Sequence, residues 1–181
     1  MKELKKFIIP FVGLKLGEHR FDFRISKSFF EYFEYKDFND VDILLDVLLI
    51  KKNTMLEFTL SFKGFVNVNC DLTNEPYNQD INGEFHFVVN FGDEFNDENE
   101  ELIIVPHGSY EINIQQYVYE SIVLAVPSKR IHPGIEEGTL KSEILDKLEE
   151  LSLHQENENF LEEDKKTDPR WDKLKKLLTD K

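Results

Sequence analysis

The residues whose types and spacing come closest to a reactive motif are a cysteine and a threonine at Cys-x-x-Cys spacing. The chain has one cysteine, Cys70, and Thr73 stands where a second thiol would complete a metal-binding or redox pair. Cys70 continues an apolar alternation, so its thiol is expected to point into the core of a sheet. A buried thiol of this kind is ordinarily inert. The pattern therefore predicts a structural cysteine and excludes an intrachain disulfide.

Histidines and carboxylates do not indicate a second centre. The five histidines are spread along the chain without the close spacing of metal ligands: His19, His86, His107, His132 and His154. Adjacent carboxylates such as Glu100-Glu101 fall in a predicted loop, whereas a glycosidase needs its two carboxyl groups held rigidly. We therefore expect a protein that is not an enzyme, with no metal and no cofactor. The alternative is a metal-dependent hydrolase built from scattered ligands.

Charge is distributed unevenly along the 181 residues, whose formal net charge is −14. Residues 1–63 contain eleven basic and ten acidic side chains, whereas residues 64–128 contain twelve acidic ones and neither Lys nor Arg. An acidic field repels phosphate backbones and attracts basic proteins, although acidic surfaces also serve solubility alone. The sequence therefore favours a basic protein partner over DNA.

Neither a membrane span nor a signal peptide is predicted. The sequence has no apolar run near the roughly 18 residues that a membrane-spanning helix needs. Residues 1–16 lack the length and the cleavage site of a signal peptide. We expect a cytoplasmic protein without membrane contact.

Alternating apolar residues predict a β-sheet, and the sixteen Phe and six Tyr suit its pleated surface. The predicted strands are residues 20–26, 42–50, 56–70, 85–91 and 102–105. Residues 42–50 are almost wholly apolar, as in a central strand, and residues 51–54 turn the chain into a hairpin. Gly64 falls on the apolar face of residues 56–70, where the long strand is expected to bend or bulge. Residues 92–101 are expected to form an acidic loop.

Helical spacing of apolar residues follows the last strand. It predicts helices over residues 113–125 and 140–151, the first with Asn113 as N-cap and Pro127 as its stop. A short helical turn is expected at residues 28–33. The predicted fold class is α+β: an antiparallel twisted sheet or partial β-barrel with two packed helices and a tethered C-terminal helix.

The C-terminal residues are predicted to form a separate element. Residues 154–166 are polar and acidic, which is typical of a flexible linker. Asp168 and Pro169 are a typical helix start, and an apolar stripe follows at Trp171, Leu174 and Leu178. The predicted domains are a core at 1–153, an acidic linker at 154–166 and a C-terminal helix at 167–181. We expect this helix to dock on a partner through Trp171; the alternative is that Trp171 fills the core.

Three segments, taken in order, are similar to motifs of one protein family. Residues 64–76 form an apolar strand that leads into the Cys70 turn, where the family has Cys-x-x-Cys. Residues 112–127 resemble the family's helix, with Glu120, a Leu-Ala-aliphatic-Pro ending at Pro127 and a histidine nearby, His132. A C-terminal Asp-Pro-Arg-aromatic-x-x-Leu motif is similar to Asp168, Pro169, Arg170, Trp171 and Leu174. The chain thus resembles the YceD family, the bacterial large-ribosomal-RNA-subunit accumulation proteins.

The resemblance implies a part in the accumulation or processing of large-subunit ribosomal RNA, and it implies no reaction. Thr73 departs from the motif and argues against a metal role. Combined with the charge pattern, the resemblance favours a non-catalytic factor that binds a basic ribosomal protein or assembly factor. Direct RNA binding through Lys2, Lys5 and Lys6 or the C-terminal lysines is a secondary possibility. The Phe-rich strands motivate one alternative, a β-barrel-like carrier of a small apolar ligand.

Overall fold

The computed structural model describes residues 4–99, 101–140, 142–148 and 150–151. The chain divides into two compact units, Met1–Pro133 and Gly134–Lys181. The predicted linker at 154–166 and the predicted helix at 167–181 lie outside the described residues.

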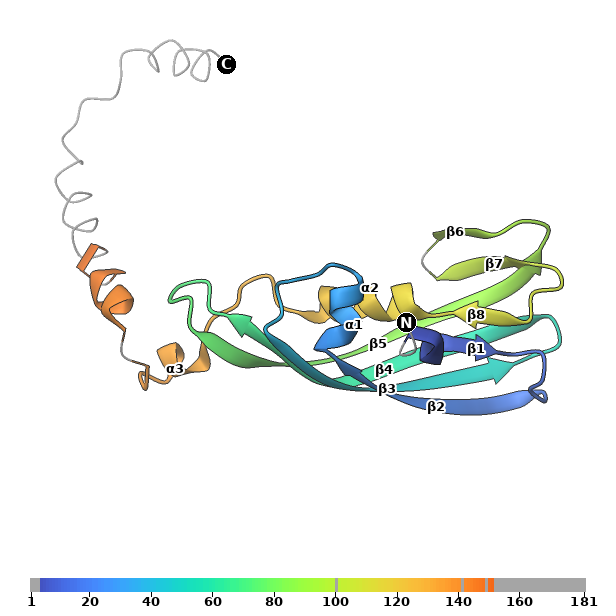
Figure 1. Ribbon diagram of the computed structural model, residues 1–181, viewed down its shortest axis with the longest axis horizontal. Helices are drawn as coiled ribbons and strands as arrows, with labels where there is room; N and C mark the ends of the chain where they lie inside the picture. Colours follow the sequence, from blue (N-terminus) through green and yellow to red (C-terminus); the bar gives the residue numbers. More distant parts are fainter. Residues whose placement is uncertain (1–3, 100, 141, 149, 152–181) are drawn as a thin grey trace, which may run out of the picture. The chain divides into compact units, whose positions relative to one another are not determined.

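A six-stranded mixed sheet forms the body of the first unit (Figure 1). In spatial order its strands are β2 (Gly17–Ser26), β3 (Asp40–Lys51), β4 (Met55–Asn69), β5 (Pro76–Gly92), β7 (Leu102–Pro106) and β6 (Asn96–Asn99). Strands β2 to β5 pair antiparallel, whereas β7 runs parallel to β5. Strands β2 and β6 are the edges among the described strands, so the sheet is open and not a closed barrel. The predicted antiparallel pairing is therefore confirmed for β2 to β5, but β7 makes the sheet mixed, and the described fold is mostly β with a few short helices, not the predicted α+β.

The parallel pair arises from a strand that the sequence did not predict. Residues 92–101 were expected to form a loop, but Asn96–Asn99 make the edge strand β6, which pairs antiparallel with β7. Strand β6 carries the chain back along the sheet, so β7 enters between β5 and β6 in the direction of β5. All four residues of β6 are exposed, and without an apolar alternation the strand leaves no period-2 signal in the sequence.

The other predicted strands are confirmed, but β5 begins at Pro76, nine residues before the strand predicted at 85–91. Odd-numbered residues of β3 and even-numbered residues of β4 are buried on the same face, as the alternation predicts. Of the bend or bulge expected at Gly64, the bulge is wrong, because Gly64 pairs in continuous register with Ile43 and Ile81. A Cβ at this position would lie 2.1 Å from the backbone oxygen of Asp42. Glycine is therefore needed here so that β3 can approach β4 closely.

Helices and a small two-stranded sheet lie on one side of the large sheet (Figure 1). They are η1 (Leu4–Phe7), α1 (Lys27–Tyr32), α2 (Gln115–Ala125) and the pair β1 (Ile8–Pro10) and β8 (Glu111–Asn113). Helix α2 buries Val118 and Ile122 and contacts β5, where the rings of Tyr117 and Phe87 lie 5.0 Å apart. The helix predicted at 113–125 is confirmed with a later start. Ile114 is the N-cap, and the Asn113 side chain accepts a hydrogen bond from the Gln115 amide at 3.0 Å.

Beyond Pro133 the described residues contain short helices. Helix α3 is the single turn Pro133–Glu136, and residues 143–148 and 150–151 are helical where a helix over 140–151 was predicted. Its apolar side chains are not buried as expected for a packed helix, since Ile144 and Leu148 are each 43% exposed and Leu151 is 62% exposed. No helix in the described part of the chain is long and apolar enough to span a membrane.

Candidate functional site

The turn between β4 and β5 presents the cysteine that the sequence singled out. The Cys70 amide donates to the Glu75 carbonyl at 2.9 Å, and the Asn74 amide donates to the Cys70 carbonyl at 2.8 Å. Asn74 has φ 59°, in the left-handed region that asparagine adopts more readily than most residues. These bonds fix a tight turn that holds the Cys70 side chain in the interior.

The segment that follows α2 is bound to this turn although it lies some sixty residues away in the sequence. The Asp71 amide donates to the Arg130 carbonyl at 2.8 Å, and the Arg130 amide donates to Asp71 Oδ2 at 2.7 Å. Arg130 Nε also lies 3.5 Å from Asp71 Oδ1. Next along the chain, the His132 amide donates to Cys70 Sγ at 3.3 Å, and its ring lies edge-on to Tyr77. We call this arrangement the Cys70 clasp: Cys70, Asp71, Thr73, Arg130 and His132.

Two opposing effects set the acidity of the Cys70 thiol. Burial, with 2% of the residue exposed, raises its pKa. Hydrogen bonds from the Thr73 hydroxyl and from the amides of His132, Thr73 and Leu72 act in the other direction, and together they bring the pKa of Cys70 below its ordinary value. The threonine at the second motif position therefore polarises the sulfur. The predicted burial of Cys70 is confirmed.

A family model described as large ribosomal RNA subunit accumulation protein YceD matches residues 58–178, two-thirds of the chain. The chain belongs to the YceD family. The match includes β5, the Cys70 clasp, α2 and the C-terminal motif at residues 168–174. No curated protein and no solved structure matches the chain.

The YceD-family residues named from the sequence divide into two groups. Cys70 and the segment after Pro127 meet in the Cys70 clasp. Glu120 lies elsewhere: it is exposed on α2, accepts a hydrogen bond from Gln116 Nε2 at 2.9 Å, and makes no hydrogen bond or ion pair with the clasp among the described residues. The remaining motif residues lie outside the described part of the chain: Asp168, Pro169, Arg170, Trp171 and Leu174.

Sequence reasoning missed the contacts of His132 and Arg130. His132 has no ligand spacing in the sequence, yet its amide contacts Cys70 and its ring contacts Tyr77. The Asp71–Arg130 pair joins positions 59 apart, and no local pattern encodes such a pairing. No group of three or more His, Cys, Asp or Glu side chains able to hold a metal occurs within the described residues. As it stands, the clasp joins two parts of the fold around a polarised but enclosed sulfur.

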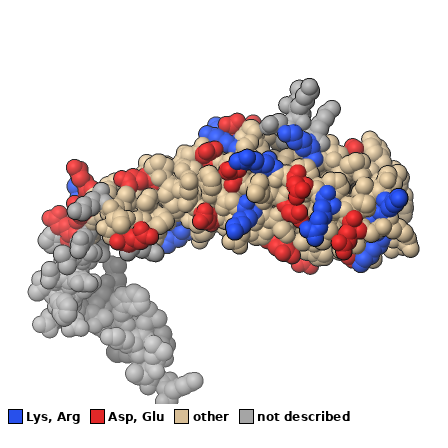
Figure 2. Space-filling model, turned by 90° about the horizontal axis from the view of Figure 1, so that it is seen from below, with Lys and Arg blue, Asp and Glu red and all other residues tan. Residues whose placement is uncertain are grey.

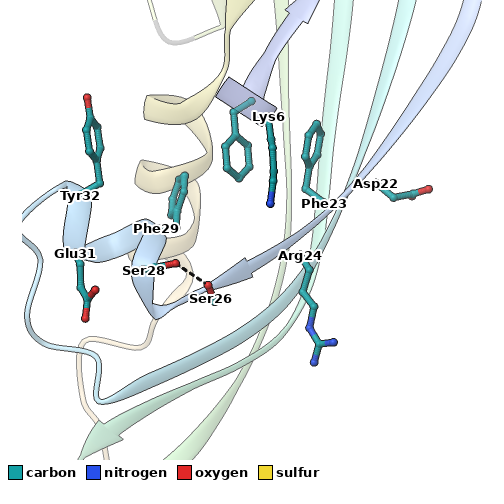
Figure 3. A pocket seen from close by; sticks show the side chains of 10 residues that line it. Lys6, Asp22, Phe23, Arg24, Ser26, Ser28, Phe29, Glu31 and Tyr32 are labelled. Carbon is teal, nitrogen blue, oxygen red and sulfur yellow. Dashed lines mark hydrogen bonds between the residues drawn. The ribbon is translucent and has the colours of Figure 1, made fainter. Parts of the chain in front are cut away.

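A cavity of about 580 Å³ between η1, β2 and α1 bears on the carrier alternative (Figure 3). Its apolar wall consists of Phe7, Phe23 and Phe29, and Figure 3 shows Asp22 directed away from the rings of Phe23 and Phe29. The Phe7 ring already lies 5.0 Å from Phe23 and 4.9 Å from Phe29. Deeper in the sheet, Phe58 and Phe87 stack on each other in the closed core. The core of the sheet at Phe58 and Phe87 is therefore closed, whereas the cavity beside Phe7, Phe23 and Phe29 is open space.

Proposed function

We propose that this YceD-family protein is a non-catalytic factor that supports the accumulation of large-subunit ribosomal RNA by binding a basic protein during ribosome assembly. The observation that carries the proposal is the family match over residues 58–178, which includes the acidic residues 64–128. Residues 64–128 contain no Lys or Arg, so this part of the surface offers phosphate groups no cationic contact. An acidic surface of this kind suits a basic protein.

Three basic side chains on or next to the sheet already face carboxylates. On the face seen from below, on the side of β2, Lys and Arg are interspersed with Asp and Glu (Figure 2). Arg24 forms a two-pronged ion pair with Asp42 at 2.7 Å, and Arg20 lies 3.9 Å from Asp46. Lys52 is paired with Glu57. Cations that already face carboxylates have less to gain from phosphate, which supports a protein partner over RNA.

The enclosure of Cys70 supports a proposal without a reaction. The Cys70 thiol is the polarised nucleophile of the clasp, and only 2% of the residue is exposed. A polarised thiol acts in catalysis only where a substrate can reach it.

Depletion of the protein in its host tests the role. We expect mature large subunits to fall relative to small subunits in sucrose gradients, and re-expression of the wild-type chain should restore the ratio. A normal ratio in depleted cells would overturn the proposed function.

Cross-linking in lysate tests whether the partner is a protein: a basic ribosomal or assembly protein should remain attached after RNase treatment. Cross-links that disappear entirely with the RNA would contradict protein binding.

A further inference from the structure

A groove of about 490 Å³ lies beside the first turn of α2. Its walls come from the end of α1, the segment around β6, and the chain that leads from β7 through β8 into α2. Its lining includes four aromatic and two acidic side chains: Tyr32, Phe33, Phe95, Tyr117, Asp97 and Glu111. We call this site the aromatic groove. All of them belong to the first unit.

The aromatic groove exposes rings that a folded core would normally bury. Tyr32 is 58% exposed and Phe95 is 57% exposed, while Phe33 and Tyr117 are half-buried. Three of the rings are held by ring contacts: Phe33 stacks on Tyr119 at 4.3 Å, Tyr117 packs on Phe87, and Tyr32 lies edge-on to Phe33 at 5.3 Å. Exposed aromatic side chains on a rigid backing are typical of binding sites, where they supply contact area at little entropic cost.

The charge of the aromatic groove has one sign. Asp97 and Glu111 line it and are exposed, and none of its described lining residues is Lys or Arg. Neither carboxylate forms a salt bridge among the described residues. The N-terminus of α2 adds the equivalent of roughly half a positive charge, which two carboxylates outweigh. Burial and then the nearby Asp97 and Glu120 raise the pKa of Tyr117 to about 12, which agrees with a negative local field.

We infer that the aromatic groove binds an extended segment of the basic partner in which arginine or lysine alternates with apolar residues. This inference rests on the proposed function and names the surface that carries it out. A guanidinium or ammonium group can lie on the face of Tyr32 or Phe95 and pair with Asp97 or Glu111 in the same site. Single-stranded RNA could stack on the same rings, but its phosphates would meet uncompensated carboxylates.

Fluorescence anisotropy with a labelled peptide of alternating Arg and Leu, added to the full-length protein, tests the inference. A peptide with Glu in place of Arg and an oligouridine of similar length are the comparison probes. We expect the Arg peptide to bind in the micromolar range, more weakly as salt is raised, and the other two probes to bind at least tenfold more weakly. Absence of Arg-peptide binding, or a preference for the oligouridine, would overturn the inference.

Substitutions in the aromatic groove test whether the Arg peptide binds there. The double change Asp97→Asn and Glu111→Gln keeps side-chain shape and removes two charges, so it should weaken the Arg peptide about tenfold. Phe95→Ala removes an exposed ring and should weaken it about fivefold. The matched control is Asp80→Asn with Glu84→Gln, two exposed carboxylates of β5 outside the groove, with an expected effect below about twofold. Equal weakening by the control would show only non-specific attraction and contradict the site.

Complementation separates this inference from the proposed function. In depleted cells, the Asp97→Asn and Glu111→Gln chain should fail to restore large subunits, whereas the Asp80→Asn and Glu84→Gln chain should restore them. Full rescue by the groove variant would overturn the aromatic groove as the binding site and leave the role in accumulation intact. Normal subunits in the depleted cells would instead refute the role itself.

Discussion

Carboxylates are paired with a basic residue beyond one end of α2 and have no such partner among the described residues near its other end. After its C-terminal end, the chain enters the Cys70 clasp, where the Asp71 carboxylate accepts the Arg130 amide and faces its guanidinium. At its N-terminal end, Asp97 and Glu111 border the aromatic groove without a basic residue in its described lining. The helix has eleven residues, about 16 Å from end to end, and the first clasp residue after it, Arg130, follows five residues beyond Ala125. Charge paired within the chain stabilises the fold, and charge left to solvent beside exposed rings is available to a partner.

Removal of the Asp71 carboxylate should have the largest effect on stability. Asp71→Ala deletes the acceptor of the Arg130 amide and the partner of its guanidinium. We expect the free energy of unfolding to fall by about 2 kcal/mol, because hydrogen bonds to a charged group are worth more than neutral ones. Urea denaturation measures the change. Arg-peptide binding at the aromatic groove should be unaffected.

Asp80→Ala is the control for Asp71→Ala, since it removes the same charge from an exposed position without a side-chain partner among the described residues. Its expected effect is below about 0.5 kcal/mol. If the two variants lost equal stability, the clasp would contribute nothing beyond net charge, and the contrast between the two ends of α2 would not hold.

Cys70→Ala should have a smaller effect and lower the free energy of unfolding by about 1 kcal/mol near neutral pH, because only a small buried side chain is lost. The sign of the pH dependence follows from the lowered pKa of Cys70 in the fold. An acid whose folded pKa is depressed stabilises the fold above its unfolded pKa, and this contribution is lost as pH falls through the folded value. The stability gap between wild type and Cys70→Ala should therefore widen as pH rises towards 9. A gap that stays constant with pH would contradict the polarisation of the sulfur by Thr73.

The sequence predicted the features that depend on local periodicity. Strands β2 to β4, the second half of β5, the hairpin of β3 and β4, the burial of Cys70 and helix α2 all follow from the spacing of apolar residues. Features that depend on pairing between distant residues escaped it. Strand β6 has no apolar residue, and the pair β1 and β8 joins two three-residue strands about a hundred positions apart. The direction of β7 follows from where β6 places the chain, which no spacing within β7 encodes.

Of the two candidate sites, the sequence predicted the residues around Cys70 but not the aromatic groove. The motif around Cys70 and the acidic character of residues 64–128 are both visible in the sequence. The aromatic groove is not, because its rings come from residues 32, 33, 95 and 117, each of which also fits a core or a surface role in its own segment. Only the fold brings them beside Asp97 and Glu111.

The smallest expected effect concerns the charge of the aromatic groove itself. Burial of the Tyr117 ring, followed by the negative charges of Asp97 and Glu120, raises the pKa of Tyr117 to about 12. Asp97→Asn removes one of these charges, so the pKa of Tyr117 should fall while it remains above the ordinary 10.0, since the ring stays buried. The difference in ultraviolet absorbance between each chain and its Tyr117→Phe counterpart isolates this titration from the other five tyrosines.

The same group gives the sign of a stability change in alkali. Between pH 10 and about 12 the unfolded tyrosine ionises before the folded one, so the folded state retains more protons and stability falls as pH rises. Tyr117→Phe should flatten this fall, and Asp97→Asn should move its upper limit to lower pH. Asp80→Asn, outside the groove, should change neither the pKa of Tyr117 nor the slope. If Asp97→Asn also left the pKa of Tyr117 and the slope unchanged, the Asp97 carboxylate would not act on the groove. Glu111 would then be the one remaining carboxylate in the described lining of the groove to attract a basic segment.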